Sequence, residues 1–209
     1  MTSRPGSQEV LDDLGDKIVI GLATALRDAR EDLGVYRAAH PGWVADATKR
    51  GLANWLHDRI IAHCRRELED VSGLTVAHRE PFTDITVGLR YRIRVKKHSK
   101  IGLVATYPTR GALAFFEQSA TLFSEIGLDE VRLCVGYEWD ADMATMGQTV
   151  LSLHDGYGEP PIWIIELPAA PPQAGTAPVS TAPPAPVPGL PTVIVSPNIG
   201  DNRKENEEE

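Results

Sequence analysis

Three side chains that could cooperate in metal-dependent hydrolysis lie near one another in the sequence: Glu80, Asp84 and Lys96. In one common nuclease arrangement, carboxylates near a strand hold Mg²⁺ and a lysine further along orients the attacking water. That arrangement needs an anion two positions before the lysine, where this chain has Arg94, so Glu80 or Glu138 would have to replace it. A degenerate nuclease-like site at Glu80, Asp84 and Lys96 is therefore kept as an alternative.

The histidine and cysteine spacings predict no metal site. His57 and His63 are six residues apart in a predicted helix, which turns their side chains about 120° from alignment, whereas zinc-binding pairs are three or four apart. His63 and Glu67 have the required spacing, but no second ligand pair with matching spacing occurs elsewhere. The isolated glycines Gly88 and Gly102 do not form a phosphate-cradling loop. We expect neither a metal nor a cofactor.

Apolar and mostly basic residues alternate through residues 85–97, which predicts one long strand with an apolar face and a basic face. The candidate binding residues of this basic strand are Arg90, Arg92, Arg94, Lys96 and Lys97. They could contact the phosphates of a nucleic acid, although Tyr91 falls on the apolar face and offers no base-stacking platform. The acids Glu138, Asp140 and Asp142 are alternative partners, which would neutralise the basic face within the molecule.

The charge of the whole chain does not favour nucleic acid. The 209 residues include 29 acids and 21 bases, for a net charge of −8. Residues 168–209 contribute five acids and two bases, which leaves 24 acids and 19 bases, or −5, for the rest. The bulk charge therefore does not predict nucleic-acid binding.

No membrane segment is expected, since the longest apolar stretch, Ile18–Leu26, is too short to span a bilayer. Asp12, Asp13 and Asp16 precede it, where a signal peptide would carry basic residues. Cys64 and Cys134 are the only cysteines, and two cysteines do not make a disulfide framework. We therefore expect a cytoplasmic protein with reduced, buried thiols.

Helical periodicity and stop signals predict three helices. They are residues 8–33 with Gly34 as the stop, residues 44–69 after a linker at 35–42, and a short helix capped by Thr109. Alternating patterns predict the strands, which are residues 74–79, 85–97, 131–139, 148–154 and 161–167, the last two joined as an antiparallel hairpin.

This order predicts an α+β fold, with two N-terminal helices and a third helix packed on a mostly antiparallel sheet. Residues 1–167 form the single domain. Residues 168–209 hold ten of the sixteen prolines and no aromatic residue, which predicts a disordered tail with an acidic end. Within that tail, the apolar segment 191–196 is a candidate docking strand for a sheet edge.

Four segments resemble a group of uncharacterised companion proteins from high-GC bacteria and their prophages, encoded beside helix-turn-helix repressor and zinc metallopeptidase pairs. The segments are Tyr91-Arg92-Ile93-Arg94-Val95-Lys96-Lys97, Tyr107-Pro108-Thr109, Val131-Arg132-Leu133-Cys134-Val135-Gly136-Tyr137-Glu138-Trp139-Asp140 and Ile162-Trp163-Ile164-Ile165-Glu166-Leu167. The resemblance spans residues 43–167 and implies a regulatory, toxin–antitoxin or phage-immunity setting. It carries no catalytic residues over, and the Pro-rich tail departs from the group.

Together these patterns predict a non-enzymatic interaction or regulatory protein that binds a protein partner. Nucleic-acid binding by the basic strand and the degenerate nuclease-like site are the alternatives. The oligomeric state is left open.

Overall fold

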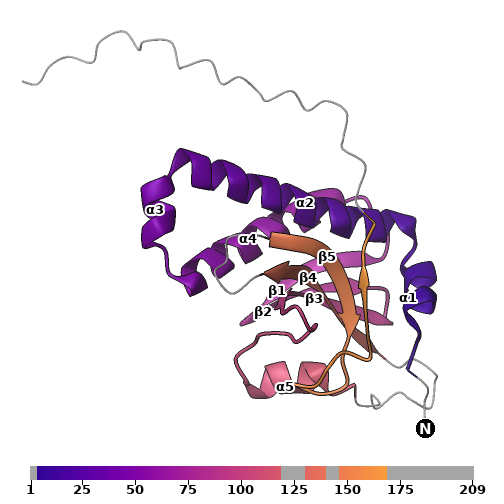
Figure 1. Ribbon diagram of the computed structural model, residues 1–209. Coiled ribbons are helices and arrows are strands. Elements are labelled where there is room, and N and C mark those ends of the chain that lie inside the picture. Colours follow the sequence, from indigo (N-terminus) through magenta and orange to yellow (C-terminus); the bar gives the residue numbers. More distant parts are fainter. Residues whose placement is uncertain (1–3, 119–129, 140–145, 169–209) are drawn as a thin grey trace, which may run out of the picture. The chain divides into compact units, whose positions relative to one another are not determined.

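The computed structural model describes residues 4–118, 130–139 and 146–168, which form five helices and a six-stranded sheet (Figure 1). The predicted α+β class is confirmed. All of the described residues belong to one structural unit, Met1–Pro171. The predicted disordered tail, its segment 191–196, and the acids Asp140 and Asp142 lie outside the described residues, apart from Pro168 at the start of that tail.

The strands follow one another across the sheet in chain order. They are β1 (Leu74–Arg79), β2 (Phe82–Val87), β3 (Tyr91–His98), β4 (Val131–Trp139), β5 (Met146–Leu153) and β6 (Trp163–Glu166). Four neighbouring pairs are antiparallel, and β3 and β4 are parallel. The expectation of a mostly antiparallel sheet is confirmed, and the predicted bounds of β1 and β4 match the structure.

The helices are α1 (Ser7–Leu14), α2 (Asp16–Ala39), α3 (Pro41–Asp46), α4 (Lys49–Glu67) and α5 (Arg110–Phe116). The predicted helix 8–33 is divided at Gly15, whose φ of 75° and ψ of 157° interrupt the helical backbone. Gly34 does not end α2, and the predicted linker 35–42 is wrong, because α2 continues to Ala39 and α3 follows at once.

Side-chain caps mark the starts of α4 and α5. Thr48 Oγ1 accepts a hydrogen bond of 3.0 Å from the backbone N–H of Gly51, so α4 begins later than the predicted residue 44. Thr109 Oγ1 accepts one of 3.2 Å from Ala112, which confirms Thr109 as the predicted N-cap. No helix among the described residues is long and apolar enough to cross a membrane.

The single long strand predicted for residues 85–97 is wrong, because β2 and β3 form an antiparallel hairpin. Gly88 has a φ of 56°, a left-handed conformation that glycine adopts without steric cost. Leu89 lies in the resulting turn and is 82% exposed. The apolar and polar residues alternate through this turn as they would in a strand, which is why the pattern concealed it.

The sheet separates two apolar clusters of unequal size. The helices α1, α2 and α4 cover one face, where they pack against a large core that includes Tyr91, Ile93, Leu133 and Leu151. The short helix α5 lies on the opposite side of the sheet in Figure 1, where Phe115 and Phe116 pack with Cys134. The α5 side of the sheet therefore has much less apolar packing, and most of its central positions are polar.

Candidate functional site

The side of the sheet that faces α5, called the polar face below, carries most of the predicted basic residues. On β3, Arg92, Arg94 and Lys96 alternate with the core residues Ile93 and Val95, so they point away from α2 and α4. The sequence correctly separated the two faces of this strand. It did not show that the basic face would be covered.

Arg94 is almost fully buried on the polar face. Its Nε donates to Asp84 Oδ1 at 2.6 Å, and the two side chains are 8% and 5% exposed. The guanidinium carbon lies 4.0 Å from the ring centre of Phe82 and 4.2 Å from that of Phe115. Arg94 is therefore held between two phenyl rings, which favour a cation over their faces.

The other two arginines of the basic strand also meet carboxylates. Arg92 Nη2 lies 2.7 Å from Glu130 Oε1, just before β4. Arg90 lies in the β2–β3 turn and forms ion pairs with Glu9 and Asp13 of α1. The partners are therefore different from Glu138, and Arg90, Arg92 and Arg94 each have a carboxylate partner within the protein.

The two lysines of the basic strand lie on opposite faces of the sheet. Lys96 is half-buried on the polar face and donates to Thr106 Oγ1 at 3.2 Å, and its burial lowers the pKa of the ammonium. Lys97 shares the face of the core, where its Nζ is 5.6 Å from the ring centre of Trp139. A continuous cationic surface along residues 90–97 is not formed.

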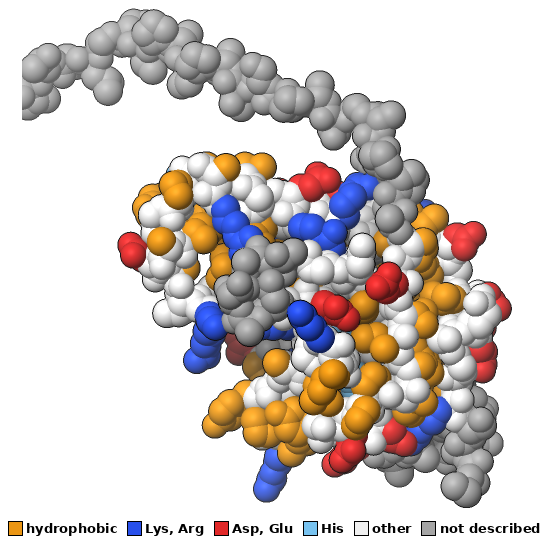
Figure 2. Space-filling view, in the orientation of Figure 1, with side chains coloured by type: hydrophobic (Ala, Val, Ile, Leu, Met, Phe, Trp, Pro, Cys, Tyr) orange, Lys and Arg blue, Asp and Glu red, His pale blue; other side chains and the backbone are white. Residues whose placement is uncertain are grey.

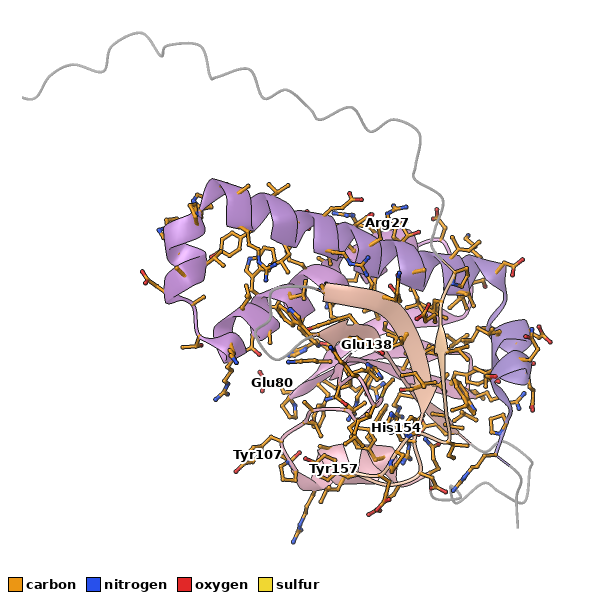
Figure 3. All side chains as sticks on the ribbon, in the orientation of Figure 1. Arg27, Glu80, Tyr107, Glu138, His154 and Tyr157 are labelled. Atoms are coloured by element: carbon orange, nitrogen blue, oxygen red, sulfur yellow. The ribbon has the colours of Figure 1, made fainter. Side chains whose placement is uncertain are left out.

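The three residues of the nuclease-like alternative lie in different surroundings in the structure. They are Glu80, Asp84 and Lys96. Glu80 is exposed in the turn between β1 and β2, and Asp84 is buried with Arg94. Figure 3 shows Glu80 at the edge of the molecule, away from the centre of the sheet. Within residues 4–118, 130–139 and 146–168, no group of three or more His, Cys, Asp and Glu side chains could hold a metal ion. Catalysis by these residues stays a prediction.

A buried chain of hydrogen bonds, absent from the sequence analysis, joins His98, Ser152 and His154. Ser152 Oγ lies 2.8 Å from His98 Nε2 and 3.0 Å from His154 Nε2. Burial, followed by the neighbouring His154, lowers the pKa of His98 to about 4, and burial also lowers the pKa of His154. Ser152 is 0% exposed, so a substrate cannot reach its hydroxyl in this conformation.

Exposed apolar side chains gather where loop 99–109 meets the β5–β6 connection. Their members, called the apolar surface below, are Ile101, Tyr107, Tyr157, Ile162 and Ile164. Tyr107 is 83% exposed and Ile101 is 73% exposed. Figure 2 shows hydrophobic side chains collected on the lower part of the molecule, and Figure 3 places Tyr107 and Tyr157 there, near α5.

Two contacts hold the loops of the apolar surface together. Tyr157 donates its hydroxyl to the backbone carbonyl of Thr106 at 3.0 Å. A Cβ atom placed on Gly102 would lie 2.9 Å from Pro161 and 3.5 Å from Ile164, so the two segments pack closely at this glycine. The alternating pattern of β6 predicted a strand at Ile162–Ile164, but no local signal showed that loop 99–109 would lie beside it.

The fold and these surfaces define an α+β protein with a polar sheet face, a buried histidine pair and an exposed apolar surface. A search of family models, of curated proteins and of solved structures finds no match to this chain.

Proposed function

We propose that this chain is a non-enzymatic interaction protein that binds a protein partner through the apolar surface. The observation that carries the proposal is the group of five exposed apolar side chains on loop 99–109, the β5–β6 connection and β6, which contact one another. Contiguous exposed apolar groups of this kind are typical of binding surfaces, whereas single exposed apolar residues are common everywhere.

The composition of the apolar surface fits protein recognition. Tyr107 and Tyr157 offer large apolar rings with a polar end, a combination that is enriched in protein interfaces. Burying one such ring removes apolar area from water, and it costs less conformational entropy than ordering a long flexible side chain. The Tyr107 hydroxyl remains available to a partner's polar groups at the rim.

The surroundings of the basic-strand arginines argue against the alternative of nucleic-acid binding. A nucleic-acid surface needs an extended row of exposed cations along which the phosphates of a strand can lie, but Arg90 lies in the turn against α1, Arg94 is buried, and both pair with carboxylates of this chain. The resemblance noted for residues 43–167 adds a proposed setting, in which the interaction regulates phage immunity or a toxin–antitoxin pair.

The test is an affinity capture from native-host lysate with tagged full-length protein, before and after nuclease treatment, followed by mass spectrometry. Tyr107→Asp places a charge on the most exposed side chain of the apolar surface. Leu89→Asp is the matched control, since Leu89 is equally exposed but lies in the β2–β3 turn, at the opposite end of β3 from His98.

The proposal expects one protein that both the wild type and Leu89→Asp retain after nuclease treatment, and that Tyr107→Asp loses at least tenfold. Purified partner should then bind with the same ranking in a direct titration. Retention of nucleic acid alone, or equal capture by Tyr107→Asp, would contradict the proposal. Light scattering on the purified protein measures self-association. If the wild type self-associates and Tyr107→Asp does not, the apolar surface binds a second copy of this chain, which would also contradict the proposal of a different protein partner.

A further inference from the structure

A pocket of about 260 Å³ lies on the polar face, between α5 and the strands β2, β3 and β4. Three guanidinium groups line it, from Arg92, Arg94 and Arg132. The rings of Phe82 and Phe115 form apolar walls. None of its lining residues carries a carboxylate. The pocket is small for a drug-sized molecule but large enough for a single anionic group with a modest substituent.

Two buried nitrogen atoms of these arginines lack a hydrogen-bond acceptor among the described residues. They are Nη1 of Arg94 and Nε of Arg92. Arg94 is the deeper residue, with a side chain 8% exposed and with Nε as the atom bonded to Asp84. A buried N–H without an acceptor is costly, and such a group commonly marks the position of a bound ion or water.

Among the described residues, the ion pairs of the three lining arginines leave an excess of one cation. Asp84 pairs with Arg94, and Glu130 is shared between Arg92 and Arg132, at 2.7 and 2.8 Å. Three guanidinium groups therefore face two carboxylates. Because an arginine fork matches the spacing of two oxygens, an oxyanion could use donors that the two carboxylates leave unused.

The arginines are held in fixed positions by the surrounding structure. Phe82 and Phe115 enclose the guanidinium of Arg94, and Arg132 Nη1 donates to the carbonyls of Ala114 at 2.5 Å and Glu117 at 2.8 Å at the end of α5. Holding donors in advance reduces the entropy that a ligand must overcome on binding. This preorganisation distinguishes the pocket from a group of mobile surface arginines.

We propose that this pocket binds the phosphate group of a small phosphorylated molecule, with Arg92 and Arg94 as the principal donors. A phosphate monoester presents three oxygens and close to two negative charges at neutral pH, which suits three guanidinium groups, two from β3 and one from β4. A carboxylate offers two oxygens and one charge. The phenyl walls accept an apolar or aromatic part of the same ligand.

The test titrates full-length protein with phenyl phosphate by calorimetry and by NMR of the arginine Nε–H signals. Arg92→Gln is the informative variant, because Glu130 keeps Arg132 as its partner when Arg92 is removed. Arg90→Gln is the matched control, since Arg90 also pairs with carboxylates but lies in the turn against α1 and outside the pocket. Benzoate and a short single-stranded oligonucleotide are the comparison ligands.

The proposal expects saturable binding of phenyl phosphate to the wild type and to Arg90→Gln, with affinity at least about tenfold lower in Arg92→Gln. In the wild type, the Arg92 and Arg94 Nε–H signals should shift on titration, a readout that does not depend on any variant folding. Absence of saturable binding, equal affinity in Arg92→Gln, or benzoate binding as tightly would overturn it. Binding of the oligonucleotide alone would replace it with recognition of nucleic acid.

Discussion

At the scale of single residues, His98 shows how burial makes a side chain sensitive to pH. His98 is fully buried beside Ser152 and His154, and desolvation, followed by the charge of His154, lowers its pKa to about 4. An unfolded histidine has a pKa near 6.5, so below that pH the unfolded chain binds the proton more readily than the folded chain. The stability contributed by neutral His98 is present above about pH 6.5 and is lost as the pH falls toward 4.

We therefore expect the free energy of unfolding to fall by about 2 kcal/mol between pH 7 and pH 5 through His98 alone. Urea unfolding of wild type and His98→Gln at both values of pH measures this contribution as the difference between their pH dependences. His40→Gln, at an exposed position, should keep the wild-type dependence. An identical loss in wild type and His98→Gln would show that His98 does not titrate in this range.

The residues of β3 also show how far a sequence pattern reaches. Alternation placed Tyr91 and Ile93 on one face and Arg92 and Arg94 on the other, and this separation is confirmed. The burial of Arg94 was not predictable, because its partners come from β2 and α5, through Asp84, Phe82 and Phe115. A pattern with a period of two identifies the faces of a strand but not what covers them.

At the scale of elements, two glycines in the N-terminal helical region have different roles, which the sequence alone did not assign correctly. Gly34 was predicted to end the helix, but the break is at Gly15. Gly15 separates α1 from α2 with a φ of 75° and a ψ of 157°, a region that other residues seldom adopt. Gly34 lies inside α2 without positive φ. A side chain added at either position would meet no atom within 4 Å. The two sites therefore differ in backbone conformation and not in space.

Alanine substitutions at these positions should have opposite effects on stability. Gly15→Ala should lower the free energy of unfolding by about 1–3 kcal/mol, because alanine is strained in that conformation. Gly34→Ala should raise it by about 0.5–1 kcal/mol, because alanine favours the helix and restricts the unfolded chain. Thermal and urea unfolding of both variants measure this, and a stabilising Gly15→Ala would mean that α1 and α2 can form one continuous helix.

The hairpin of β2 and β3 gives the same lesson for strands. Sequence alternation continued through Gly88, Leu89 and Arg90, so the strand was predicted to be unbroken. The positive φ of Gly88 makes the turn, and the backbone N–H of Gly88 donates to the carbonyl of Gly73 at 2.8 Å. That hydrogen bond joins the turn to the residue before β1. Because the two glycines are far apart in the sequence, the residues around Gly88 do not reveal the contact, and tertiary structure determines where β2 ends.

At the scale of the whole described unit, the sheet divides packing unequally between its two sides. The large core binds α1, α2 and α4 to the sheet, whereas α5 rests on the small cluster of Phe115, Phe116 and Cys134. Local stability follows the amount of apolar surface that an element buries. The helix α5, which borders the pocket proposed to bind phosphate, is therefore expected to open without unfolding of the main core.

Hydrogen exchange tests this unequal stability and its connection to ligand binding. Amides of α5 should exchange with a lower opening free energy than those of α2, α4, β3 and β4, which should exchange close to the global value. Phenyl phosphate at saturation should slow exchange in α5 more than elsewhere, because Ala114 and Phe115 of α5 line the pocket. Equal protection of α5 and α4 in the free protein would show that the small cluster stabilises α5 as firmly as the main core stabilises α4.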